Sequence, residues 1–236
     1  MVRDMIYINN SYYKDIIIEV YKEKEKISIW LNNIFGFSID SEIIFESYIK
    51  IGAQACSVKN KIYICFELLN YKKSLLNFYL PHEMIHQYLG IYITFIGEFS
   101  LFILEILVEF TQYFYIKEKN IHKFYENHLR ESILNFKNIP NNMFSRNIIF
   151  NVNTNYIDPY LFKIGVYILI KLLNDFILFK KFLNKIIMGN GTYSFEKFLD
   201  DVEIVFGEHK KVEIENYFNI PLNQLLIKIK EDKLKC

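Results

Sequence analysis

The chain has 236 residues, of which 52% are hydrophobic and 23% are charged, and its formal net charge is +1 at pH 7. This length predicts one large domain or two small ones, and the apolar content is sufficient for a buried core. The near-neutral charge argues against nucleic acid or an anionic membrane surface as a partner.

The cysteines and the apolar segments indicate the compartment. Cys56, Cys65 and Cys236 are widely spaced and form no Cys-x-x-Cys pair. An odd and scattered set fits a reducing compartment, so we expect a cytoplasmic protein without a disulfide framework. Charged residues interrupt the two most apolar segments, residues 88–114 and 160–183. We therefore expect buried helices and no stable membrane insertion.

The first part of the chain changes from helical to strand-like patterns. Residues 5–9 favour a short strand, and an apolar stripe with a 3.6-residue period predicts a helix over residues 15–35, ended by Gly36. Residues 43–51 and a run beginning at Lys61 are rich in β-branched and aromatic residues. They predict a small sheet of three or four strands, with Lys61–Glu67 as its edge strand.

The second part of the chain is predicted to be mainly helical. Residues 71–79 are expected to connect the sheet to a helix that begins at Pro81, a residue favoured in the first helical turn, and ends near Gly90. Ser100 is expected to cap a helix over residues 101–118. Further helices are predicted at residues 160–176, 180–188, 194–205 and 213–219.

These elements together predict an α+β fold, with a small mixed sheet near the amino terminus followed by a mainly helical half. We expect a single domain over residues 1–236. In this division residues 1–80 supply a helix and the sheet, and residues 81–236 supply the helical part.

The clearest chemical motif is His-Glu-x-x-His at His82, Glu83 and His86. Residues four apart lie on one face of a helix, so the two imidazoles can converge on one point. A catalytic zinc has three protein ligands and a water, and imidazole nitrogen is one of its preferred ligands. The motif therefore predicts one Zn²⁺ per chain, with Glu83 as the general base.

A third ligand has to come from elsewhere in the chain. The candidates are the carboxylates of Glu98, Glu105 and Glu109, which interrupt an otherwise apolar segment. Burying a carboxylate without a partner is costly, and a metal ion supplies the compensation. Glu109 is the main competitor of Glu105. It could instead accept a hydrogen bond from a ligating imidazole.

The spacing of these residues resembles a known family. His-Glu-x-x-His followed by eighteen residues and a glutamate is similar to the ligand spacing of the aminopeptidase-N-type enzymes among the gluzincin zinc metallopeptidases, and it implies Glu105 as third ligand. The run HEMIHQYLGIYIT also resembles the family's sequence, with Gln87, Gly90 and Thr94 in register. The resemblance covers residues 43–218, implies a thermolysin-like catalytic domain and is strongest over residues 82–113.

The resemblance also suggests a catalytic tyrosine. Tyr160 follows a proline, as does the family tyrosine that donates a hydrogen bond in the transition state, but Gly165 lies two residues too far from it. Tyr156 is the alternative donor.

One difference from the family bears on specificity. Aminopeptidases of this type carry a glutamate that binds the free amine of the substrate, whereas residues 52–56 read Gly-Ala-Gln-Ala-Cys. The resemblance thus implies a short gluzincin-like peptidase that hydrolyses peptides or unfolded segments, without support for exopeptidase specificity. The strand Lys61–Glu67 is expected to pair with the substrate backbone. A catalytically inactive binding module, an intramembrane zinc protease and a zinc hydrolase acting on a non-peptide bond are the alternatives.

Overall fold

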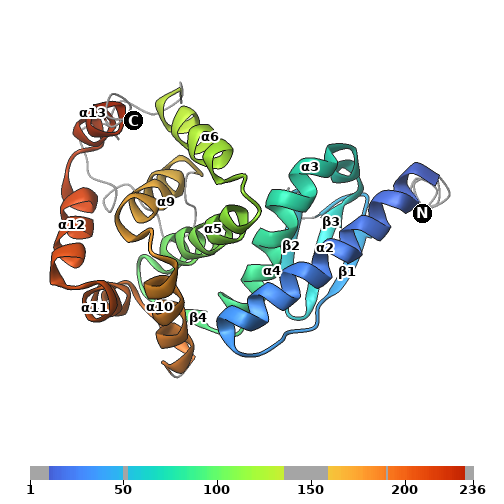
Figure 1. The fold of residues 1–236 in the computed structure, drawn as a ribbon, viewed down its shortest axis with the longest axis horizontal. Helices are drawn as coiled ribbons and strands as arrows, with labels where there is room; N and C mark the ends of the chain where they lie inside the picture. The colour runs from blue at the N-terminus through green and yellow to red at the C-terminus, as the bar shows by residue number, and fades with distance from the viewer. Residues whose placement is uncertain (1–10, 50–52, 136–158, 190, 232–236) are drawn as a thin grey trace. The chain divides into compact units, whose positions relative to one another are not determined.

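The computed structural model describes residues 11–49, 53–135, 159–189 and 191–231. The chain divides into two compact units, Met1–Ile93 and Thr94–Cys236, each of which is described by itself (Figure 1). The single catalytic domain expected from the sequence stays a prediction. The strand expected at residues 5–9 lies outside the described residues.

The first unit contains a three-stranded mixed sheet of β1 (Glu42–Glu46), β2 (Ala55–Val58) and β3 (Lys61–Cys65). The strand order is β1-β3-β2, in which β1 runs parallel and β2 antiparallel to β3. The strand beginning at Lys61 is therefore central, and its prediction as the edge strand was wrong. Strand β2 was missed because residues 52–60, which contain it, include a glycine and small side chains that are typical of turns.

Helices accompany this sheet. Helix α2 (Ser11–Phe35) packs against α4 (Leu80–Tyr88), and the rings of Phe35 and Tyr88 stack with centroids 4.6 Å apart (Figure 1). The segment expected as a plain connection is helical. It contains a 3₁₀ turn η1 (Phe66–Tyr71), a short α3 (Lys72–Ser74) and a π-helical turn η2 (Leu75–Tyr79) that runs directly into α4.

The second unit is mainly helical. Its strands β4 (Thr94–Phe95) and β5 (Thr192–Tyr193) pair in parallel. Its described helices are α5 (Ser100–Glu118), α6 (His122–Leu134), α9 (Pro159–Leu173), α10 (Phe176–Met188), α11 (Phe195–Phe206), α12 (Glu208–Asn219) and α13 (Leu222–Glu231).

The caps of these helices explain several boundaries. Ser100 was expected to cap α5, but it is the first helical residue, and Phe99 occupies the N-cap without a side-chain hydrogen bond. The side chain of Ser194 does cap α11, because its hydroxyl accepts a hydrogen bond from the backbone N–H of Lys197. Asp175 caps α10 in the same way, which starts that helix four residues before the predicted position.

Helix α5 forms the centre of the second unit. Between Phe102 and Ile116 all residues except Leu104, Glu105 and Glu109 are buried. The helix packs against α6, α9 and α11. It approaches α9 closely at Gly165, where an added Cβ would lie only 2.8 Å from a methyl carbon of Ile106.

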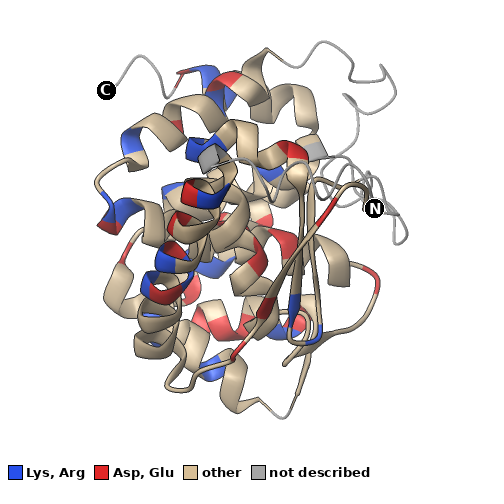
Figure 2. Cartoon of the chain, turned by 90° about the vertical axis from the view of Figure 1, so that its right-hand side faces the viewer, with Lys and Arg blue, Asp and Glu red and all other residues tan. Residues whose placement is uncertain are grey.

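The described residues thus form a mixed α+β protein that is mostly helical and has a small sheet. Basic and acidic residues are interspersed along its helices (Figure 2). Among the residues placed in the structure, none of the helices combines the length and apolarity needed to cross a membrane.

Candidate metal centre

The two motif histidines lie one turn apart on α4. Pro81 occupies the first turn of this helix, directly after the π-helical turn η2. Both imidazoles are half-buried, and their Nε2 atoms lie 3.0 Å apart. The ring planes meet at 74°. The helix therefore directs the same nitrogen of His82 and of His86 toward one point.

This separation fits two ligands of one metal ion. Two nitrogens bound tetrahedrally to zinc at about 2.0–2.1 Å lie about 3.3 Å apart. The same 3.0 Å would also suit a hydrogen bond between two neutral rings, one of which would carry its proton on Nε2. In a metal site both Nε2 atoms are unprotonated, so each ring carries its proton on Nδ1.

Glu83 follows the first histidine and is buried, with 7% of its surface exposed. Its backbone carbonyl accepts a hydrogen bond of 2.6 Å from the hydroxyl of Ser57 on β2. Burial raises the pKa of the Cys56 thiol, and the negative charges of Glu83 and Glu46 raise it further. Strand β2 thus lies beside the helix that carries the proposed general base.

Gln87 fixes the turn that joins β2 to β3. It is buried, with 1% exposed, and its amide nitrogen donates to the carbonyl oxygens of Val58 and Lys61 at 3.1 Å each. Its amide oxygen accepts from the backbone N–H of Asn60 at 3.0 Å. Asn60 has a φ of +57°, in the left-handed region that asparagine tolerates. The sequence indicated Gln87 only through the family resemblance and did not indicate these contacts.

The strand order changes the expected surface for substrate pairing. Both sides of Lys61–Cys65 are hydrogen-bonded, by β1 and by β2, so this strand cannot add a peptide strand at its edge. Within the described sheet, β2 pairs with β3 alone and lies at the edge. The expectation that Lys61–Glu67 pairs with a substrate was therefore wrong.

The remaining candidate ligands lie around α5 in the second unit. Glu98 is exposed and precedes the helix. Glu105 and Glu109 are half-buried and one helical turn apart, so their side chains project from the same face. The carboxylate of Glu109 accepts a hydrogen bond from the hydroxyl of Tyr125 on α6. Burial and the charge of Glu109 raise the pKa of Tyr125 well above its ordinary value, so this hydroxyl stays protonated.

The candidate transition-state donor, Tyr160, is the second residue of α9 and is buried, with 2% exposed. Tyr156, the alternative, lies outside the described residues.

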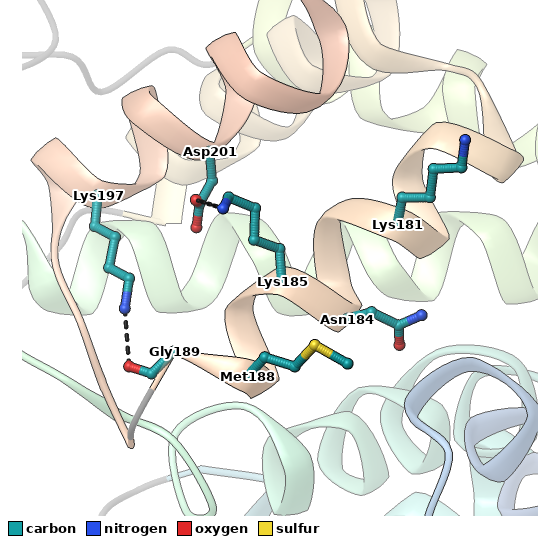
Figure 3. A pocket seen from close by; sticks show the side chains of 7 residues that line it. All are labelled: Lys181, Asn184, Lys185, Met188, Gly189, Lys197 and Asp201. Carbon is teal, nitrogen blue, oxygen red and sulfur yellow. Dashed lines mark hydrogen bonds and ion pairs between the residues drawn. The ribbon is translucent and has the colours of Figure 1, made fainter.

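A separate hollow of about 400 Å³ opens between α10 and α11 (Figure 3). Two of its three lysines, Lys185 and Lys197, have partners within the protein. Lys185 pairs with the buried Asp201 at 3.5 Å, and Lys197 donates to the carbonyl oxygen of Gly189 at 2.8 Å. These contacts tie α11 to α10 and to the turn after it, so the hollow is explained by packing between the two helices.

Comparison with known proteins does not identify a family. No protein-family model matches the chain, and a search of curated proteins finds no significant match. The function therefore has to be argued from the residues of the chain.

Proposed function

We propose that the protein is a zinc-dependent peptidase of the gluzincin, thermolysin-like class, in which His82, His86 and Glu105 bind one zinc ion. The observation that carries the proposal is that the Nε2 atoms of His82 and His86 lie 3.0 Å apart on one helix. The spacing of Glu105 after the motif supplies the third ligand. Two imidazoles and one carboxylate are a ligand set typical of catalytic zinc, which keeps a further position for water.

When bound, zinc lowers the pKa of a water molecule toward neutrality and polarises the carbonyl group of the substrate. Glu83 is adjacent to His82 and buried, which suits a general base that works away from bulk water. Its carboxylate takes a proton from the attacking water and delivers it to the leaving amine. Tyr160 donates a hydrogen bond to the oxyanion of the tetrahedral intermediate.

The sheet supports peptides as the proposed substrate class. The edge strand β2 is joined to α4 through Ser57 and Gln87, so an extended peptide that pairs with β2 would lie along the helix that carries Glu83. Such pairing recognises the backbone of peptides and unfolded segments. Because Gly52–Cys56 lacks a glutamate to bind a free amine, we propose cleavage within chains.

The test combines zinc stoichiometry with hydrolysis of a peptide library, measured on the wild type and on Glu83→Gln. We expect about one zinc per chain in both proteins. Hydrolysis should fall by about 10²–10⁴-fold in Glu83→Gln, since this is the usual contribution of a general base. Mass spectrometry of the products distinguishes internal cleavage from removal of single terminal residues.

Two carboxylate variants test the ligand set. Glu105→Gln should lose zinc, whereas Glu98→Gln should retain both zinc and activity, because Glu98 is exposed and outside the proposed set. Wild-type protein without zinc after purification and zinc dialysis would refute the proposal. Bound zinc without hydrolysis of any peptide would instead favour the inactive binding module, or hydrolysis of a non-peptide bond.

A further inference from the structure

The pairing of β2 with β3 determines which backbone groups of β2 face the free edge of the sheet. The backbone N–H of Cys65 donates to the carbonyl oxygen of Gln54 at 2.8 Å, so these residues form a hydrogen-bonded pair at one end of the ladder. In an antiparallel ladder such pairs alternate with pairs that exchange no hydrogen bond. Ala55 and Ser57 belong to the second kind, and their N–H and C=O groups therefore point away from β3.

These groups lie on the side of β2 where a peptide strand can add. Within the described sheet, β2 pairs with β3 alone. A peptide on this edge would form its main-chain hydrogen bonds with Ala55 and Ser57, because the backbone groups of Cys56 and Val58 face β3. The register thus indicates two residues, two positions apart, as the contacts of a substrate backbone.

The side chain of Ser57 is directed toward α4. Its hydroxyl donates to the backbone carbonyl of Glu83 at 2.6 Å. Ser57 is half-buried and Glu83 is buried, so water competes little for this bond. A carbonyl oxygen has two lone pairs, so Glu83 can accept this bond in addition to a helical one. The hydrogen bond therefore ties β2 to α4 without disturbing the helix.

Ser57 thus has a contact on each side of the proposed reaction. Its backbone faces the position of the substrate, and its side chain holds the backbone of the proposed general base. Gln87, one turn further along α4, holds the next residue of β2 through the carbonyl oxygen of Val58. Of these two attachments, only that of Ser57 is made to Glu83 itself.

We propose that Ser57 is a positioning residue that couples peptide binding on β2 to the general base Glu83. A peptide paired with the backbone of Ser57 is held at a fixed distance from Glu83, because the same residue is hydrogen-bonded to the backbone of Glu83. A misplacement of about 1 Å can cost about 10²-fold in rate, so this bond serves the chemical step more than binding. This inference rests on the proposed function and involves residues of the first unit only.

The first experiment compares the kinetics of Ser57→Ala and Ser57→Thr, per bound zinc, on a peptide that the wild type cleaves. Ser57→Ala should lower kcat about 10–100-fold and leave KM nearly unchanged, because the backbone of this residue still pairs with the peptide. Ser57→Thr keeps a hydroxyl and should recover most of the lost kcat. Tyr13→Phe is the matched control and should keep both constants, since it removes a hydroxyl that ties α2 to η1 through Asn70.

The second experiment requires no turnover and no substitution of Ser57. Amide hydrogen exchange is followed by NMR in Glu83→Gln, with and without saturating peptide, so that the peptide stays intact. The N–H groups of Ala55 and Ser57 should exchange about 10-fold or more slowly with peptide bound. Those of Cys56 and Val58 should change little, because they are already bonded to β3.

The outcomes separate this inference from the proposed function. Wild-type kcat in Ser57→Ala, a loss confined to KM, or an equal loss of kcat in Tyr13→Phe would overturn the coupling while zinc-dependent hydrolysis stands. Unchanged exchange at both Ala55 and Ser57 would show that the peptide does not pair with β2, and would overturn it as well. A wild type that binds no zinc or cleaves no peptide would overturn the proposed function, and this inference with it.

Discussion

At the scale of single residues, Gln87 links the metal-binding helix to the sheet. One buried side chain satisfies two carbonyl groups and one N–H group of the turn between β2 and β3. The same turn follows the end of β2, the edge strand that we propose for substrate binding. The position of β2 beside Glu83 therefore depends on Gln87, which takes no part in the proposed reaction.

Gln87→Ala tests this link. The variant leaves polar groups of the turn without their partner, and we expect the free energy of unfolding to fall by about 2–4 kcal/mol. Urea denaturation followed by circular dichroism measures the loss. Gln54→Ala is the control, because Gln54 is exposed and makes one side-chain hydrogen bond, with Tyr79. An effect of Gln87→Ala no larger than that of Gln54→Ala would show that the turn holds its position without this amide.

The site residues differ in how far the sequence could predict them. The convergence of His82 and His86 follows from helical periodicity within one motif and is confirmed by their facing Nε2 atoms. The partners of Gln87 and Glu109 could not be predicted in this way. They lie 26–29 and 16 residues distant in the sequence and come into contact only when separate elements pack together.

At the scale of elements, the long helices were predictable and the short elements were not. A period of 3.6 residues located α2, and the residues expected at helix starts, Pro81 and Ser100, located α4 and α5, each within a few residues of the observed bounds. The 3₁₀ and π turns between Phe66 and Tyr79 have other periods, so the same rule did not detect them. Strand β2 has only four residues and depends on its pairing with β3.

Gly165 determines how closely α9 can approach α5. An added Cβ would lie 2.8 Å from Ile106 and 2.9 Å from Phe102, which is closer than carbon atoms normally approach. Gly165→Ala gains about 1 kcal/mol of helix propensity, but the overpacking costs about 1–3 kcal/mol. We therefore expect Gly165→Ala to be less stable than the wild type when thermal unfolding is measured, although alanine is the better helix former.

A double-mutant cycle tests the cause. Phe102→Leu removes the ring atoms that the new methyl group would meet, so it should reduce the cost of Gly165→Ala. If Gly165→Ala stabilises the protein, α5 and α9 have more room than the observed contact allows. If the losses of stability caused by the two substitutions simply add, the strain of Gly165→Ala does not arise from contact with Phe102.

At the scale of the whole molecule, the α+β composition was predictable because it reflects patterns summed over many residues. The division into two units was not, since it depends on which elements contact each other. Helix α4 lies in the same unit as the sheet, although the sequence grouped it with the helical half. Each unit contains at least one buried tyrosine whose pKa is raised by its surroundings. The stability of both units should therefore depend on pH in the same direction.

The tyrosines with raised pKa are Tyr88, Tyr113, Tyr125 and Tyr193. Burial is the largest cause in each, and carboxylates add to it at the last three. An unfolded chain loses these protons as the pH rises through about 10, whereas the folded protein retains them. Unfolding therefore releases protons above pH 10, and stability should decrease there while remaining unaffected by these groups at lower pH.

Tyr193→Phe measures the contribution of one group. Its hydroxyl is buried beside the Asp201 carboxylate without a hydrogen bond of ordinary geometry to the described residues, so its removal should change stability little at pH 7. Between pH 10 and 12 the variant should lose about 1.4 kcal/mol less per pH unit than the wild type. Urea denaturation at several pH values, with tyrosinate absorbance as the ionisation signal, makes the comparison. If the free energy of unfolding falls equally with pH in the two proteins, Tyr193 ionises within the folded protein. Its burial would then not contribute to the loss of stability at high pH.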